Sequence, residues 1–369
     1  MHRILEAFRR EAYRFSRAEA AARGGLLALR CVSCLLRSVS TPGADRDFTR
    51  TPPPVGAGAI HRRKASAPVH RRGLPRPLPD DDKAAFVKVS VIVPAYDEEA
   101  VLGRCLEALA RQRTPAAEII VVDNNSADRT AEVAAAFAEH GVRVVREARQ
   151  GAVHARNRGF DEACGEVLGR IDADTVVGPE WVAGVAASFA ADPATGLAPD
   201  AVTGPSWFYD VPLRRMGLAA HRFFCHRLNR LLSGHAMLWG SNMALSRQCW
   251  HRVRAHTCTA PGIWEDLDLA VHLSRLGMRV RYVDGLRVPV SARRIGASVS
   301  ELYAYLRAWP RTYRLHGRRR AAGGAAVCLL IGLVLLRPCS LLVRAYTPYD
   351  GRWSPVGLLR RSATGRPLP

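Results

Sequence analysis

Residues 87–172 of this 369-residue chain alternate short β-branched runs with amphipathic segments. Runs rich in valine and isoleucine predict buried strands over residues 89–94, 118–123, 143–146 and 167–172. Between them, apolar residues recur at helical spacing and predict helices over residues 98–112, 126–140 and 152–164. Because strands that alternate with helices of this length form βαβ units, the sequence predicts an α/β fold with a mostly parallel central sheet.

The rest of the chain is organised around this segment. Strands are expected over residues 201–209 and 235–246, helices over about 212–232 and 263–276, and extended chain over 279–290. We divide the chain into a basic, largely disordered extension, a central domain in two halves, and a basic C-terminal region. Their bounds are residues 1–86, 87–300 (halves 87–174 and 175–300) and 301–369.

Positive charge is concentrated outside the central domain. Of the formal net charge of +21, residues 1–86 hold +9 and residues 301–369 hold +10, which leaves +2 for the residues between them. An enzyme acting on nucleic acid is expected to place its basic residues around the working groove. Basic ends on a nearly neutral domain favour an anionic membrane surface as partner, and no nucleic acid.

Acidic side chains gather at or near the predicted strand ends. They are Glu98 after the first strand, Asp123 after the second, Asp172-Ala-Asp174 after the fourth, and Glu265-Asp266 at the start of a later helix. In open α/β sheets, ligands bind at the carboxyl ends of the strands. The side chains of Asp172 and Asp174 point to one face, and two hard oxygen ligands suit Mg²⁺ or Mn²⁺ shared with substrate phosphates.

These motifs together resemble the inverting family 2 glycosyltransferases, which have the Rossmann-like nucleotide-diphospho-sugar transferase (glycosyltransferase A) fold. The resemblance covers residues 87–290, and Asp97 stands where the family usually has asparagine. It rests on Val91-Ile-Val-Pro-Ala-Tyr-Asp-Glu-Glu, Ile119-Ile-Val-Val-Asp-Asn-Asn-Ser-Ala-Asp-Arg-Thr, Gly151-Ala-Val-His-Ala-Arg-Asn-Arg-Gly, Ile171-Asp-Ala-Asp-Thr, Gly240-Ser-Asn-Met-Ala and Trp264-Glu-Asp-Leu-Asp-Leu.

The resemblance implies a role for each matching residue. Asp174, with Asp172, would hold Mg²⁺ or Mn²⁺ on the diphosphate, and Asp266 would be the catalytic base with Glu265 beside it. The nucleotide-sugar would lie against Pro94, Ala95, Tyr96, Glu98, Asp123, Gly151, Arg156, Asp172 and Ala173. The acceptor pocket would be shaped by Gly240, Asn242 and Trp264.

The implied reaction is a single displacement that inverts the anomeric carbon. The donor is a nucleotide-diphospho-sugar, with UDP favoured over GDP or dTDP, and the acceptor is a hydroxyl group, possibly on a lipid-linked or cell-envelope glycan. Two alternatives remain. A sugar-nucleotide nucleotidyltransferase typically has a glycine-rich basic loop after its first strand, where this chain has the acidic Tyr96-Asp-Glu-Glu. A catalytically inactive sugar-binding membrane protein would have lost the metal or base residue.

The C-terminal region contains a candidate membrane segment. Residues 321–336 are uncharged, and residues 321–343 together have the length to span a bilayer, although they include Arg337. Arginines precede this segment, and positive charges flanking a membrane segment favour the cytoplasmic side. We therefore expect the catalytic domain at the cytoplasmic face of the cell membrane. A buried amphipathic helix is the alternative.

Nine scattered cysteines indicate free thiols in a reducing compartment. Cys31 and Cys34 form a lone Cys-x-x-Cys with no second pair at zinc spacing, which disfavours a metal site.

Overall fold

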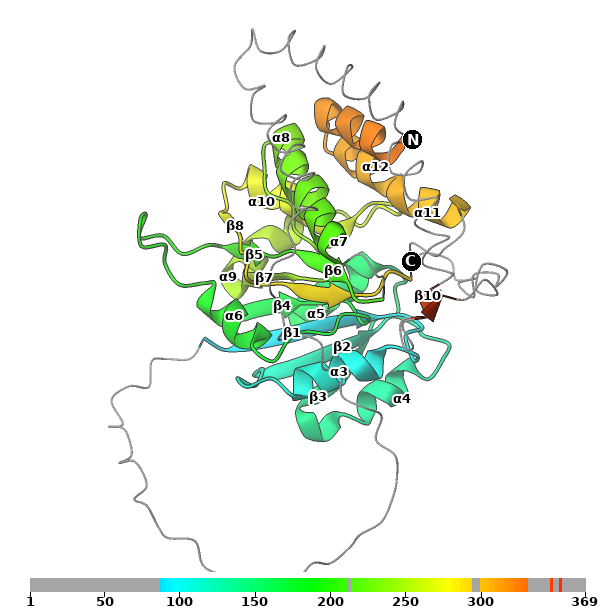
Figure 1. Ribbon diagram of the computed structural model, residues 1–369. Helices are drawn as coiled ribbons and strands as arrows, with labels where there is room; N and C mark the ends of the chain where they lie inside the picture. The colour runs from blue at the N-terminus through cyan, green and yellow to red at the C-terminus, as the bar shows by residue number, and fades with distance from the viewer. Residues whose placement is uncertain (1–86, 211–213, 294–298, 331–345, 348–351, 354–369) are drawn as a thin grey trace, which may run out of the picture. The chain divides into compact units, whose positions relative to one another are not determined.

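The computed structural model describes residues 87–210, 214–293, 299–330, 346–347 and 352–353 (Figure 1). All of them belong to one structural unit, residues 83–369. The expectations for the N-terminal extension, and for residues 331–343 of the candidate membrane segment, lie outside the described residues.

Seven strands form the central sheet in the order β3-β2-β1-β4-β7-β5-β8. All neighbours pair in parallel except at β7, which is antiparallel to β4 and to β5, so the predicted mostly parallel sheet is confirmed. The strands are β1 (Val89–Ala95), β2 (Glu118–Asp123), β3 (Val142–Arg146), β4 (Val167–Arg170), β5 (Ala201–Thr203), β7 (Met243–Ser246) and β8 (Val280–Tyr282).

The strands expected in the second half are shorter than predicted. Residues 201–209 divide into β5 and β6 (Ser206–Phe208), and only Met243–Ser246 of residues 235–246 is strand. Gly204 lies so close to Leu286 that a β-carbon would stand 2.0 Å from its carbonyl oxygen. Pro205 has no amide hydrogen for a sheet ladder. The chain therefore leaves the main sheet, and β6 pairs with β9 (Val288–Val290) in a separate two-stranded sheet.

Helices cover both faces of the sheet. Val91 and Val93 of β1 belong to the hydrophobic core that includes α3 (Leu102–Ala110), α4 (Thr130–Ala135) and α6 (Trp181–Ala187). Ile92 points to the other face, whose core includes α5 (Ala152–Glu162), α9 (Arg247–Val253) and α10 (Glu265–Arg275). In α5, a β-carbon at Gly159 would lie 2.4 Å from Ile92, so this helix packs directly on the strands.

A third cluster surrounds the outer side of α10. It includes residues of α12 (Ala308–Leu315) and of a helical stretch over residues 319–330. Figure 1 shows α12 beside α11 (Val299–Leu306), on the side of the sheet away from α3. The predicted helix over 212–232 is α7 (Arg214–His221), a π-helical stretch (Arg222–Leu228) and α8 (Asn229–Ser233).

The described part of the candidate membrane segment is amphipathic. Ala321 and Ala325 are buried in the third cluster and Leu329 is also buried, whereas Val327 and Leu330 are exposed. Among the described residues, no helix has both the length and the hydropathy that a membrane span needs.

Candidate active site

The loops after β1 and β2 are tied together at the carboxyl edge of the sheet. The Asp97 amide donates to the Ser126 hydroxyl at 3.0 Å, and the Asp97 carboxylate accepts from the Ala127 amide at 2.7 Å. Asp97 has a positive φ of 51°, a conformation that asparagine and aspartate adopt more readily than most residues. Aspartate therefore suits this position as well as the asparagine usual in the family.

Three carboxylates meet at this edge, as the strand-end positions predict. The buried thiol of Cys105 donates to the Asp172 carbonyl, and burial and then the charges of Asp174, Asp172 and Glu98 raise its pKa. All three carboxylates therefore lie near this buried thiol. This set of hard oxygen donors, with Asp174 nearly buried, fits Mg²⁺ or Mn²⁺.

Arg293 is a site residue that the sequence analysis missed. Its guanidinium pairs with both oxygens of Glu98 at 2.5 Å and donates to Asp174 through Nε at 3.0 Å. Asp174, which the resemblance assigns to metal binding, thus already forms an ion pair with Arg293. Residue 293 lies 119 residues beyond Asp174, and no local pattern marks it among the many arginines.

Arg170 connects the two halves of the site and was also missed. Its side chain is only 5% exposed, and its guanidinium reaches Asp172 at 3.1 Å and Glu265 at 2.7 Å. A β-carbon on Gly240 would lie 2.7 Å from the same guanidinium, so glycine leaves the room that Arg170 occupies. The sequence does contain a signal for Arg170. It is a charged residue in an otherwise apolar strand, and because it stands two positions before Asp172, the two side chains are expected on the same face of the sheet.

The acidic pair Glu265-Asp266 opens α10, where the positive end of the helix favours carboxylates. Asp266 accepts hydrogen bonds from the Gly240 amide at 2.8 Å and from the Leu267 amide at 2.7 Å. Burial and then the neighbouring Glu265 charge raise the pKa of Asp266 above its usual value. Burial also acts to raise the pKa of Glu265, but the charges of Arg170 and Arg156 outweigh it and lower that pKa.

Arg156 lies beneath the site rather than at its surface. It is fully buried, donates to the side chain of Asn157 and holds the backbone carbonyl of Glu265. Burial lowers its pKa to about 10. Arg156 therefore fixes the start of α10 from α5. Gly151, with a φ of 134°, begins that helix and donates its amide to Asn124 at 2.7 Å.

The residues assigned to the acceptor pocket divide into two groups. Gly240 lies beside Arg170 and Asp266, as described above. Asn242 is fully buried and bonds to Leu286 and Trp181, and Trp264 stacks on Trp309 with ring centroids 5.7 Å apart. The structure thus brings Gly240 to the acidic pair and places the other two in the protein interior.

The residues assigned to the nucleotide follow the strand ends. Ala95 and Asp123 are neighbours in the β1–β2 register, and Asp123 accepts from the Ser126 amide at 3.2 Å. Ala173 is buried between its two aspartates, while Pro94 and Tyr96 are partly exposed. Their contacts with a nucleotide stay predictions.

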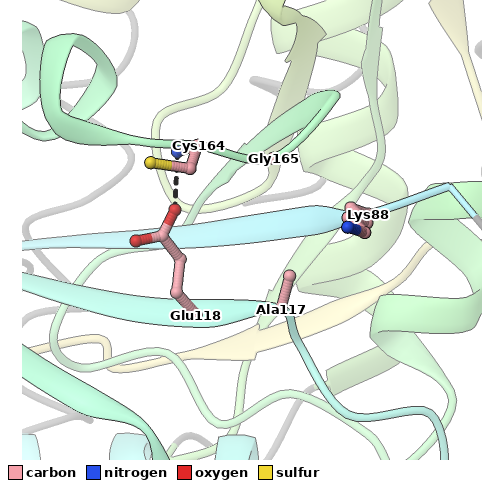
Figure 2. Close-up of a pocket in the computed structure, with 5 residues that line it drawn as sticks. All are labelled: Lys88, Ala117, Glu118, Cys164 and Gly165. Carbon is pink, nitrogen blue, oxygen red and sulfur yellow. Dashed lines mark hydrogen bonds between the residues drawn. The ribbon is translucent and has the colours of Figure 1, made fainter.

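A pocket at the opposite edge of the sheet has a different character. It is lined by Lys88, Ala117, Glu118, Cys164 and Gly165, at the amino ends of the strands (Figure 2). The Glu118 carboxylate is engaged by the Cys164 amide at 2.6 Å, the Ser90 hydroxyl at 2.6 Å and Arg143 at 3.2 Å. The carboxylate of this pocket is therefore already engaged by groups of the protein, and the candidate active site is the carboxyl edge.

Known proteins share both the sequence and the fold of this region. Residues 90–253 match the family described as glycosyl transferase family 2. The chain is 39% identical over 94 residues to the uncharacterized glycosyltransferase YibD of Escherichia coli K12, covering 25% of this chain and 27% of that one. It is 40% identical over 88 residues to the PGL/p-HBAD biosynthesis glycosyltransferase of Mycobacterium tuberculosis H37Ra, covering 23% and 34%. The matches thus span about a quarter to a third of these relatives.

A solved structure has the same fold. The mannosyltransferase PcManGT of Pyrobaculum calidifontis, in complex with GDP-Man and Mn²⁺, superposes with a TM-score of 0.51 at 19% identity, over 70% of this chain and 74% of that one. This likeness shows an α/β fold with a mostly parallel central sheet. The match to glycosyl transferase family 2 covers residues 90–253, which include the carboxylates at the ends of β1, β2 and β4.

The Arg170 contacts predict a large stability effect. Arg170→Met removes the cation that compensates Asp172 and Glu265, so we expect a loss of about 3–5 kcal/mol in the free energy of unfolding, measured by urea denaturation. Arg113→Met is the matched control, because its pair with Glu180 is 74% and 57% exposed, and we expect under about 1 kcal/mol. Equal effects of the two variants would contradict a central role for Arg170.

Proposed function

We propose that this protein is a metal-dependent, inverting glycosyltransferase that moves a sugar from a nucleotide-diphospho-sugar to a hydroxyl acceptor. The observation that supports this most is the arrangement around Arg170. One guanidinium contacts Asp172, on the donor side, and Glu265, next to the candidate base Asp266. A reaction between a nucleotide-sugar and a hydroxyl group needs both functions within one site.

The donor side would bind the nucleotide-diphospho-sugar at the carboxyl ends of β1, β2 and β4. Asp123 and the loop after β1 would contact the nucleoside, and Asp172 and Asp174 would hold Mg²⁺ or Mn²⁺. The ion, when bound, neutralises charge that develops on the diphosphate leaving group. UDP is the favoured nucleotide, and GDP enters the proposal because PcManGT was crystallised with GDP-Man and Mn²⁺.

The acceptor side would supply the proton transfer. A carboxylate base takes the proton of the incoming hydroxyl as that oxygen attacks the anomeric carbon from the face opposite the diphosphate. Asp266 is oriented for this by the Gly240 amide, while Arg170 keeps Glu265 ionised beside it. One displacement of this kind inverts the anomeric configuration.

We also propose that the protein works at the cytoplasmic face of a membrane on a lipid-linked or cell-envelope acceptor. The support is the excess of ten positive charges in residues 301–369 together with the uncharged run over residues 321–336. The exposed Val327 and Leu330 add apolar surface at the start of that run.

Donor turnover should depend on Asp174. With purified protein, UDP-, GDP- and dTDP-sugars and Mn²⁺, we expect release of free nucleotide from at least one donor, and loss of that release in Asp174→Asn with the fold retained. Glu139→Gln, which changes an exposed carboxylate between α4 and β3, is the control and should stay near wild-type activity. Full activity of Asp174→Asn would rule out the metal role.

Asp266→Asn should separate catalysis from helix capping. Loss of a positioned base lowers kcat by about 10²–10⁴, whereas loss of a carboxylate at a helix start costs only about 0.3–1 kcal/mol of stability. We expect that fall in kcat with donor binding little changed, and a β-linked product from an α-linked donor, identified by NMR. Asp284→Asn, at an exposed carboxylate, is the control. A variant within about threefold of wild type, or a product with retained configuration, would contradict the proposal.

Removal of the residues after Leu330 tests the membrane proposal. A chain that ends there keeps the buried Ala321, Ala325 and Leu329, so we expect it to fold like the full chain. In cell fractionation, the full chain should sediment with membranes and the shortened chain should move to the soluble fraction. Unchanged partitioning would assign any membrane contact to another part of the chain.

A further inference from the structure

Four potential metal ligands converge beside α10, and none of them is Glu265 or Asp266. Asp268 and His272 lie one turn apart on α10, Cys258 lies in the loop after α9, and His316 directly follows α12. One ligand atom from each of the four lies within 4.8 Å of the others. These four residues, called the cluster below, come from three segments of the chain that are separated by up to 58 residues of sequence.

Two distances within the cluster match tetrahedral coordination of a small ion. Zn²⁺ binds nitrogen and oxygen at about 2.0–2.1 Å and sulfur at about 2.3 Å, so its ligands stand roughly 3.3–3.6 Å apart. The His272 Nε2 atom lies 3.5 Å from Cys258 Sγ and 3.5 Å from Asp268 Oδ1. His316 Nε2 is 2.8 Å from the same oxygen, a hydrogen bond that would have to widen by roughly half an ångström.

The charge and burial of the cluster also fit a cation. Asp268 is fully buried, and its partners are the imidazoles of His272 and His316 and the amide of Cys258. In contrast, the carboxylates of the candidate active site face arginines, as in the pair of Asp174 with Arg293. A thiolate and a carboxylate with two neutral imidazoles carry two negative charges, which a divalent ion balances.

We propose that Cys258, Asp268, His272 and His316 bind one Zn²⁺ ion that fastens α10 to the loop after α9 and to the end of α12. Sulfur and imidazole ligands select zinc over the Mg²⁺ or Mn²⁺ that suits Asp172 and Asp174. Four protein ligands leave no open position for substrate, so the ion is structural. Its effect would be to hold the helix whose first turn carries Glu265 and Asp266.

The proposal does not depend on glycosyltransferase activity, because metal content can be measured directly. We expect the full chain to retain about one zinc per molecule after dialysis, measured by inductively coupled plasma mass spectrometry. Cobalt substitution should produce a thiolate-to-cobalt charge-transfer band in the near ultraviolet. Cys258→Ser should abolish that band, and Cys258→Ser and His316→Gln should each weaken zinc binding by at least about tenfold.

Three variants serve as controls for the site. Cys164→Ser and His140→Gln change exposed residues, and both should retain zinc. Asp174→Asn should retain it too, because that carboxylate belongs to the other site.

Two results would overturn the proposal. One is a wild-type chain with neither zinc nor a cobalt–thiolate band, which would make the cluster a hydrogen-bonded network only. The other is zinc lost in Asp174→Asn but kept in Cys258→Ser. The cobalt measurement uses the unmodified chain, so the test stands even where a variant fails to fold.

Discussion

The buried guanidinium of Arg170 is the interaction on which the candidate site depends. It lies at the end of β4, in the middle of the sheet, and contacts Asp172 in its own segment and Glu265 on α10. Burying an ion is costly unless its partners are well placed, so the positions of β4 and α10 are constrained together. Gly240 belongs to the same arrangement, because any side chain there would collide with the guanidinium, and its amide orients Asp266. One charge thus sets the geometry of both halves of the site.

The sequence predicts the first half of the fold well and the second half only in part. Strands β1 and β2 are buried and rich in β-branched residues, and amphipathic helices separate the four strands β1 to β4, so the sequence pattern identifies them. In the second half, the course of the chain depends on close contacts such as that of Gly204 with Leu286, which no local pattern reveals.

The candidate site is likewise predictable only in part. Strand-end carboxylates are visible because topology brings them to one edge, whereas Arg293 reaches Glu98 across 195 residues of sequence. The role of Asn242 in the interior likewise depends on partners from distant segments.

Helix α10 carries two different groups of functional side chains, the candidate base at its start and two of the proposed zinc ligands. Positions four apart on a helix lie on one face, so Asp268 and His272 together meet Cys258 and His316. At the start of the helix, Glu265 pairs with Arg170, and Asp266 accepts a hydrogen bond from the Gly240 amide. The remaining positions, among them Leu269 and Val271, pack into two different hydrophobic clusters. The helix therefore has little freedom to turn about its axis, since each of its faces meets a partner of a different chemical kind.

Charge balance explains why a site so rich in carboxylates can remain folded. Among the described residues, two guanidinium groups (Arg170 and Arg293) pair with four carboxylates (Glu98, Asp172, Asp174 and Glu265), a formal excess of two negative charges. That excess equals the charge of one divalent cation, which fits the hard oxygen donors at the end of β4. A nucleotide diphosphate that arrives with such a cation adds little net charge, so the arginines can keep their partners. Under the proposed function, the geometry around Arg170 can then persist when the donor binds, and the acidic pair would stay in place for the acceptor.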